Sequence, residues 1–305
     1  MRTLMWYLMA ILGLTSCYKN TTPVAETGDL KVYGTGQYAF DLPQGFASTA
    51  MQVFYHIPEG ADGNSPVLMV FHGNLRDARE SRNEMINMAN QKKCVLLVPE
   101  FSEMAFPGNN EYHLGGVFDD GENPTAGELR SSNRWTFSLV KPLFEEAKTR
   151  FGYVALKFDA FGHSAGAQFL HRLLYFESQL PLNRAFANAS GWYTLPSVAI
   201  DYPYGLRQTG LNEAQTLERV FGHSVHITVG ALDNDPNAPA LRRNAEADVQ
   251  GTNRRDRAQY FYQYSAGQAN ALGLPFSSWT FSVIPGIGHD FVPAAQYAIN
   301  TLYPQ

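Results

Sequence analysis

Short apolar runs recur along the chain and alternate with longer segments in which apolar residues return every three or four positions. The short runs predict strands at residues 37–42, 51–57, 67–71, 94–98, 156–161, 184–189, 225–229 and 279–284. The periodic segments indicate helices near residues 78–91, 133–150, 165–180, 253–272 and 291–302. From the third run onward the strands are continuously apolar, which is typical of parallel strands covered on both faces. The pattern therefore predicts an α/β fold with a mostly parallel sheet.

Two polar stretches fit neither pattern. Residues 101–129 and 192–221 are rich in glycine and scattered aromatic residues, and each follows a predicted strand at its C-terminal end. Ligands of open α/β sheets bind at that edge, so we expect these loop insertions to build the walls of a pocket. Trp192 and Tyr193, which directly follow a predicted strand, are the candidate pocket residues.

The pentapeptide Gly162-His163-Ser164-Ala165-Gly166 lies between a predicted strand and a predicted helix. A Gly-x-Ser-x-Gly sequence in that position is typical of a nucleophile elbow, in which the chain turns so sharply that the serine takes strained backbone angles. The two glycines leave room for the turn. Ser164 is therefore the candidate catalytic nucleophile.

Hydrolases built on such a sheet place the nucleophile first in the chain, an acid second and a histidine last. His289 is the one histidine that follows both Asp233 and Asp235, and it comes just after the strand predicted at residues 279–284. We predict it to be the general base. Asp233 is the preferred acid because it lies nearer the end of the preceding strand. Asp235, which precedes a proline, stays as the alternative and is otherwise expected to accept hydrogen bonds from its own loop.

A His-Gly turn, His72-Gly73-Asn74-Leu75, follows the strand predicted at residues 67–71. Its backbone N–H groups can face the elbow. We predict an oxyanion hole made by the N–H groups of Ala165 and Asn74, which would stabilise the charge that develops on a substrate carbonyl oxygen. His72 is expected to be structural.

The run from Phe161 to Phe169, with Gly191-Trp192-Tyr193-Thr194 downstream, resembles the α/β-hydrolase superfamily. Within it, the chain is similar to bacterial lipoprotein hydrolases related to polyhydroxybutyrate depolymerase-like and feruloyl-type esterases. The resemblance covers the chain from about Tyr38 onward. It implies the α/β-hydrolase fold with an eight-stranded sheet, the triad Ser164, Asp233 and His289, and acyl transfer from a small-molecule or polymeric ester without a cofactor. Asn74 and Leu75 stand where many lipases and esterases have further glycines.

Two other functions remain open from the sequence. A serine peptidase or amidase would use the same three residues. A non-catalytic surface binding protein could retain the scaffold without turnover.

The N-terminus predicts export. Arg2 precedes an apolar stretch at residues 4–14 that suits a secretory signal, and the sequence Leu14-Thr15-Ser16-Cys17 resembles a bacterial lipobox. We expect residues 1–17 to form a lipoprotein signal with Cys17 as the lipidated (palmitate-bearing) residue, residues 18–30 a flexible tether, and residues 31–305 the α/β-hydrolase domain. The domain would be anchored to the membrane of the bacterial cell envelope, facing the periplasm or the cell surface.

Composition narrows the functional classes further. The formal net charge of −5 argues against a nucleic-acid partner, and the pairs Arg242-Arg243 and Arg254-Arg255 are interpreted as solvated helix faces. No metal site is predicted, since the acidic loop that begins at Asp233 lacks the glycine and glutamate of a calcium loop. Cys94 is expected to be a buried, inert thiol.

Overall fold

The structure is a computed structural model that describes residues 32–304. The predicted signal segment, the lipidation site Cys17 and the tether lie outside the described residues. Among the helices of residues 32–304, none has the length and hydrophobicity needed to cross a bilayer.

Eight strands form one sheet in the order β1-β2-β4-β3-β5-β6-β7-β8. They are β1 (Gly34–Asp41), β2 (Ala50–Ile57), β3 (Val67–Phe71), β4 (Val95–Pro99), β5 (Phe158–His163), β6 (Leu182–Asn188), β7 (Ser224–Gly230) and β8 (Trp279–Ile284). The first two strands pair antiparallel, and all pairs from β4 to β8 are parallel. The predicted eight-stranded, mostly parallel sheet is confirmed.

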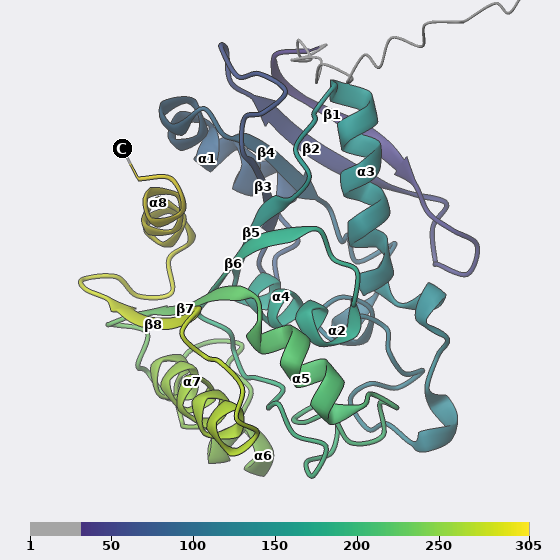
Figure 1. The fold of residues 1–305 in the computed structure, drawn as a ribbon, viewed down its shortest axis with the longest axis vertical. Coiled ribbons are helices and arrows are strands. Elements are labelled where there is room, and N and C mark those ends of the chain that lie inside the picture. Colours follow the sequence, from purple (N-terminus) through teal and green to yellow (C-terminus); the bar gives the residue numbers. More distant parts are fainter. Residues whose placement is uncertain (1–31, 305) are drawn as a thin grey trace, which may run out of the picture.

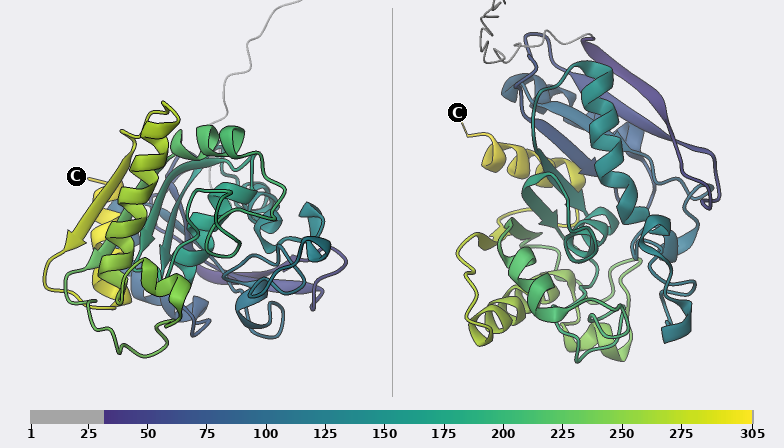
Figure 2. Two further views of the ribbon diagram at one scale, coloured as in Figure 1. Left: turned by 90° about the horizontal axis from the view of Figure 1, so that it is seen from below. Right: turned by 45° about the vertical axis from the view of Figure 1, so that its right-hand side comes forward.

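Helices cover both faces of the sheet. The longer ones are α1 (Ala78–Lys92), α3 (Val140–Phe151), α4 (Ala165–Phe176), α5 (Glu213–Phe221), α7 (Arg254–Ala271) and α8 (Phe291–Leu302); α2 (Gly108–Glu111), α6 (Ala245–Val249) and three 3₁₀ turns (Ala126–Glu128, Ser132–Arg134, Thr136–Leu139) are short. Helices α1 and α8 pack side by side on one face, whereas α3 and α4 lie on the other (Figure 1). Figure 2 shows α3 and α8 on opposite sides of the strands in its right-hand view.

Strand β3 shows why the central strands are apolar at every position. Leu68 and Val70 pack into the cluster beneath α1 and α8, whereas Met69 and Phe71 pack into the larger cluster on the opposite face. Since successive side chains of a strand point to opposite faces, a sheet covered on both sides needs apolar residues throughout. Cys94 is buried beside this strand, and burial raises the pKa of its thiol to about 12, as expected for an inert cysteine.

Two predicted helices have different bounds in the structure. The helix expected at 133–150 begins at Val140, after two 3₁₀ turns, with Pro142 in its first turn, where a proline is tolerated. The helix expected at 165–180 ends at Phe176 because Glu177 is extended.

Helix α5 was missed, because the whole stretch 192–221 was interpreted as a loop. Its signal is present in the sequence: Asn212 caps the N–H of Gln215, and Leu217, Val220 and Phe221 follow at helical spacing and are buried.

Three long segments leave the sheet at the carboxyl ends of its parallel strands. Residues 100–139 follow β4, residues 189–212 follow β6, and residues 231–253 follow β7. The predicted insertions at this edge are confirmed, and the third segment was not singled out by the sequence. All three contribute side chains to the site described next.

Candidate active site

Ser164 lies between the end of β5 and the start of α4, with φ 55° and ψ −113°. These angles are unfavourable for a residue with a Cβ atom and match the strained turn expected of a nucleophile elbow. The turn requires both glycines. A Cβ atom on Gly162 would collide with the backbone of Gly166, and one on Gly166 would collide with the carbonyl oxygen of Phe71.

Three side chains from separate parts of the chain form a continuous line of hydrogen bonds. The Oγ atom of Ser164 lies 3.0 Å from Nε2 of His289, and Nδ1 of His289 lies 2.7 Å from Oδ2 of Asp233. His289 is in the short loop between β8 and α8, and Asp233 is in the segment that follows β7. The parallel order of β5, β6, β7 and β8 brings these loops to one edge of the sheet.

The carboxylate of Asp233 is almost fully buried, with 5% of the residue exposed. Burial raises its pKa, but the hydrogen bond from His289 and the positive charges of His289 and Arg254 outweigh burial, so the net pKa is lowered. Oδ1 of Asp233 accepts a bond of 3.3 Å from the guanidinium of Arg254. The carboxylate therefore stays ionised and holds the imidazole by its Nδ1–H.

Asp235 takes the other role considered for it. It is exposed, and its carboxylate accepts a hydrogen bond of 2.8 Å from the backbone N–H of Asn237. It makes no contact with His289 in the described structure, so Asp233 is the acidic partner of the imidazole.

The ring of His163 packs against that of His289, with centroids 4.7 Å apart. Its Nδ1 donates to Oδ1 of Asn188, whose amide in turn donates to Thr228, so the tautomer of His163 is fixed by β6 and β7. Burial and the neighbouring charge of His289 lower the pKa of His163 to about 3. A neutral, fixed ring therefore supports one face of His289.

Both predicted oxyanion-hole residues lie beside Ser164. Ala165 is the first residue of α4, so its N–H is one of the N–H groups that have no partner within the helix. Asn74 is exposed and shares a pocket with Ser164 and Ala165. His72 is structural, as predicted: its Nδ1 donates to the carbonyl of Gly73, and its Nε2 accepts from the N–H of Phe101.

Two pockets flank Ser164. The first, which we call the Trp192 pocket, has a volume of about 210 Å³ and is lined by Asn74, Asn109, His113, Ser164, Ala165, Gln168, Gly191, Trp192, Ala240, Arg242 and Arg254. The second, the His289 pocket, has a volume of about 290 Å³ and includes Leu75, His163, His289 and Phe291. Ser164, Asn74, Ala240 and Arg254 line both. A ligand bound at Ser164 can thus extend to either side of the serine.

Trp192 lines the first pocket, as predicted, but Tyr193 does not. Tyr193 is fully buried and stacks on Phe261 at 4.3 Å, because consecutive residues after β6 point in different directions. Its assignment to the substrate pocket was wrong. Most aromatic residues of the segment after β4, such as Phe106 and Tyr112, also belong to the core, whereas His113 reaches the pocket.

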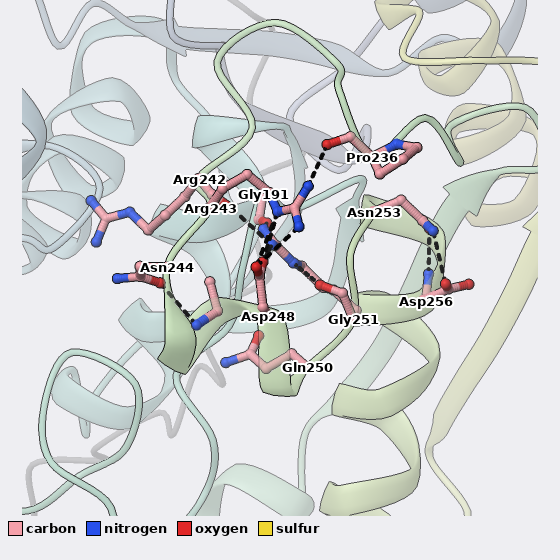
Figure 3. Close-up of polar contacts among 12 residues, drawn as sticks. Gly191, Pro236, Arg242, Arg243, Asn244, Asp248, Gln250, Gly251, Asn253 and Asp256 are labelled. Carbon is pink, nitrogen blue, oxygen red and sulfur yellow. Dashed lines mark hydrogen bonds and ion pairs between the residues drawn. The ribbon is translucent and has the colours of Figure 1, made fainter.

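The segment that carries Asp233 is held by polar contacts (Figure 3). Arg257, from α7, is fully buried and donates to the carbonyls of Gly191, Gly251 and Arg242 and to Asp248. Arg243 also binds Asp248 and reaches the carbonyl of Pro236. These bonds tie the loops after β6 and β7 together and so position both the acid and the pocket wall.

The interpretation of both arginine pairs as solvated helix faces was wrong for one member of each pair. Arg254 is 5% exposed and pairs with Asp233, and Arg242 pairs with Glu122 at 2.6 Å and lines the Trp192 pocket. Arg243 is exposed, as expected, whereas Arg255 is half-buried and donates to the carbonyl of Ala231. Because the partners come from distant segments, nothing in the local sequence distinguishes the two members of a pair.

A larger pocket, of about 680 Å³, lies between Tyr202, Tyr204, Val249 and Tyr260. Neither Ser164 nor His289 lines it, so we assign it no role in the reaction despite its size. Within residues 32–304, no three histidine, cysteine, aspartate or glutamate side chains gather closely enough to hold a metal ion.

The buried histidines give a prediction for stability. Burial lowers the pKa of His72 from 6.5 to about 4 and that of His163 from 6.5 to about 3. Below pH 6.5 the unfolded chain binds protons that the folded protein does not, so stability falls with pH until the folded values are reached. We expect each histidine to remove about 2 kcal/mol from the free energy of unfolding between pH 7 and pH 5.

Urea unfolding followed by circular dichroism at the two pH values measures this difference. Replacing His72 by glutamine removes one titrating group and is expected to reduce the pH dependence. If the free energy of unfolding of the variant fell between pH 7 and pH 5 by as much as that of the wild-type protein, the lowered pKa of His72 would be contradicted.

Comparison with known proteins places this site in a family. No protein-family model and no curated protein sequence matches the chain. Among solved structures, poly(aspartic acid) hydrolase-1 from Sphingomonas sp. KT-1 is 32% identical, with a TM-score of 0.82 over 90% of this chain and 99% of that one. LpqC, a poly(3-hydroxybutyrate) depolymerase from Bordetella parapertussis, is 30% identical, with a TM-score of 0.81 over 89% and 91%.

A more distant structure shares the fold alone. The S-formylglutathione hydrolase FrmB from Staphylococcus aureus is 10% identical, with a TM-score of 0.55 over 88% of this chain and 98% of that one. Poly(aspartic acid) hydrolase-1 and LpqC, each at least 30% identical to this chain, together with the strand order and the elbow, identify the family. The chain belongs to the α/β-hydrolase superfamily and is a hydrolase.

Proposed function

We propose that the protein is a serine hydrolase that cleaves carboxylic esters through an acyl-enzyme, with Ser164, His289 and Asp233 as its catalytic triad. The observation that carries the proposal is the continuous line of hydrogen bonds from Ser164 Oγ to His289 and on to Asp233, at 3.0 Å and 2.7 Å. These distances are within the range needed for proton transfer and for orientation of the base.

In the proposed reaction, Nε2 of His289 takes the proton of Ser164 as Oγ attacks the ester carbonyl carbon. The resulting oxyanion accepts hydrogen bonds from the N–H groups of Ala165 and Asn74. The tetrahedral intermediate collapses, the bond to the alcohol oxygen breaks, and His289 gives its proton to the leaving alcohol. Asp233 stabilises the imidazolium while that proton is held.

Deacylation repeats these steps with water. His289 accepts a proton from water as the water oxygen attacks the acyl-enzyme, and the proton then returns to Ser164 as the acid departs. Two features support His289 as the base in both halves. The ionised Asp233 binds its Nδ1–H, and the neutral ring of His163 supports one face.

The carboxylic ester is the proposed bond because one of the two similar structures described above is a poly(3-hydroxybutyrate) depolymerase, which acts on a polyester. The other, a poly(aspartic acid) hydrolase, acts on a polymer with amide links, so amide hydrolysis is the second candidate. The same triad serves both reactions, and an amide demands protonation of a poorer leaving group.

p-Nitrophenyl butyrate and butyryl p-nitroanilide separate the two candidates because they share an acyl group and differ only in the bond cleaved. We expect an initial burst of p-nitrophenol and an increase in protein mass equal to one butyryl group. Because p-nitrophenol is the better leaving group, each rate is divided by the uncatalysed rate of the same substrate, and a larger acceleration for the anilide than for the ester would instead favour the amidase.

We also propose that Cys17 is lipidated and holds the hydrolase at the cell envelope. The proposal is supported by the apolar residues 4–14 and the Leu-Thr-Ser-Cys sequence alone. Replacing Cys17 by alanine is expected to abolish incorporation of labelled palmitate in a bacterial host. Undiminished labelling of the variant would refute the anchor.

A further inference from the structure

The two pockets beside Ser164 receive different halves of an ester. The leaving group must approach Nε2 of His289 to be protonated, and His289 lines only the second pocket. The Trp192 pocket, which His289 does not line, lies on the acyl side of the serine. This assignment rests on the proposed function.

The acyl side carries an excess of positive charge. Arg242 and Arg254 line the Trp192 pocket, and the guanidinium of Arg172, which is fully buried, lies 4.1 Å from the centre of the Trp192 ring. Arg242 lies 4.6 Å from the same ring. Two of these arginines have an acidic partner: Arg242 pairs with Glu122, and Arg254 pairs with Asp233. Within residues 32–304, Arg172 has none and binds only the hydroxyl of Thr194 and backbone carbonyls.

Several polar atoms around this pocket are buried without a partner within the described residues. They are Nε2 of His113, Oε1 of Gln168, Nε of Arg254 and Nη2 of Arg172. His113 and Gln168 are each 7% exposed and line the pocket directly. Buried polar groups normally have hydrogen-bond partners, so unpaired groups in a pocket point to a ligand that supplies them.

The proximity of the cations also affects His113. Burial and the charges of Arg76, Arg172 and Arg242 lower the pKa of its imidazole, so this lining residue of the pocket is neutral and carries one N–H. Three of the four unpaired atoms are nitrogen atoms, and the amide of Gln168 can present its NH₂ group after rotation. Such a set of donors and positive charges suits an anionic oxygen ligand.

We propose that the Trp192 pocket binds a carboxylate at the far end of the acyl group, so that the preferred substrates are esters whose acyl part is a dicarboxylic acid. Arg242 and His113 would bind the carboxylate, and Trp192, held between segments by Arg172 and Arg242, would pack against the intervening methylene groups. The volume of about 210 Å³ accommodates about seven water molecules at roughly 30 Å³ each, which is enough for a short acyl chain.

Glu122 already neutralises part of this charge. Its carboxylate lies 2.6 Å from Arg242 and also accepts from Asn109, another residue of the pocket wall. A substrate carboxylate must therefore share Arg242 with Glu122. Removing the charge of Arg242 is expected to weaken the preference for an anionic ester over a neutral one, and removing the charge of Glu122 is expected to strengthen it. Changes in packing alone would not produce these opposite effects.

The test compares monoethyl glutarate with ethyl 5-methylhexanoate, in which an isopropyl group replaces the carboxylate with the same shape. Monoethyl succinate and monoethyl adipate, each with its matching branched ester, cover shorter and longer chains. The measured quantity is the ratio of kcat/KM for the anionic ester to that for its neutral partner, followed by acid release. We expect the ratio in the wild-type protein to exceed one for at least one chain length.

Arg242→Gln is expected to lower that ratio by about 10- to 100-fold, the range for loss of a charged hydrogen bond. Glu122→Gln is expected to raise it by about 2- to 5-fold, because a competing charge is removed. Arg150→Gln is the control, because Arg150 lies on α3, is exposed, pairs with Glu146 and lines neither pocket beside Ser164. The ratio should not change in this variant.

A wild-type ratio at or below one for every chain length would overturn the inference, as would a fall in the ratio for Glu122→Gln. If Arg242→Gln does not fold, Arg242→Lys and Glu122→Gln still decide the outcome through the same ratio. Hydrolysis of the neutral esters without a preference for the anionic ones would refute the carboxylate site and leave the proposed esterase intact. Failure to hydrolyse any of the esters would instead count against the proposed function.

Discussion

Replacement of Ser164 by alanine is expected to lower kcat for p-nitrophenyl butyrate by about a million-fold, to the level left by binding and the oxyanion hole alone. The serine oxygen is the atom that forms the acyl-enzyme, and no other hydroxyl in the described structure lies at the Nε2 atom of His289. Alanine removes only that oxygen and keeps the Cβ atom at the strained φ of 55°. The fold should therefore survive.

Stopped assays at high protein concentration, with circular dichroism and thermal unfolding as checks on folding, measure this effect. Activity within about tenfold of the wild-type value in a well-folded variant would reject Ser164 as the nucleophile. A general collapse of the fold would be visible in the unfolding curves and would not be mistaken for loss of chemistry.

Replacement of Asp233 by asparagine is expected to lower kcat by about 10⁴-fold. The amide keeps the shape of the carboxylate, but its NH₂ group can force the wrong tautomer of His289 and it cannot stabilise the imidazolium. Asp235→Asn is the matched control, since its exposed carboxylate serves only the turn at Asn237. We expect the control to retain activity within a factor of about two.

The Asp233 variant also leaves Arg254, which is 5% exposed, without its ionic partner. Some loss of stability is therefore expected, of the order of 3 kcal/mol for a buried pair that loses one member. Measuring kcat well below the unfolding temperature separates this loss from the chemical effect. Equal activities for the two aspartate variants would contradict the assignment of the acid.

Much of the sheet could be predicted from the sequence because its cause is local. Strand β3 has the predicted bounds, since a strand buried on both faces needs an unbroken apolar run, and polar or turn residues mark where it ends. The edge strand β8 also has the predicted bounds although only its first and last residues are buried, because Pro285 and Gly286 follow it directly. Ser164 and His289 were found from a motif and from their order in the chain. Helix α5 was missed although Asn212 and three apolar residues at helical spacing mark it, because glycine and proline dominate the stretch that contains it.

The pocket could not be predicted in the same way because its walls come from separate segments. Whether Trp192 or Tyr193 faces the serine depends on a turn after β6 that no periodicity describes. Arg242 and Arg243 are neighbours of identical chemistry, yet only Arg242 lines the pocket. Its side chain pairs with Glu122, which is 120 positions away in the sequence. Such pairings depend on tertiary structure and leave no local signal.

Labelling with a fluorophosphonate, followed by mass spectrometry of the digested protein, tests the central claim most directly, because the reagent reacts only with a serine that a neighbouring base activates. We predict a single phosphonyl adduct on Ser164 in the wild-type protein and its loss in the His289→Ala variant. An adduct on another residue, or labelling of Ser164 that does not depend on His289, would contradict the account.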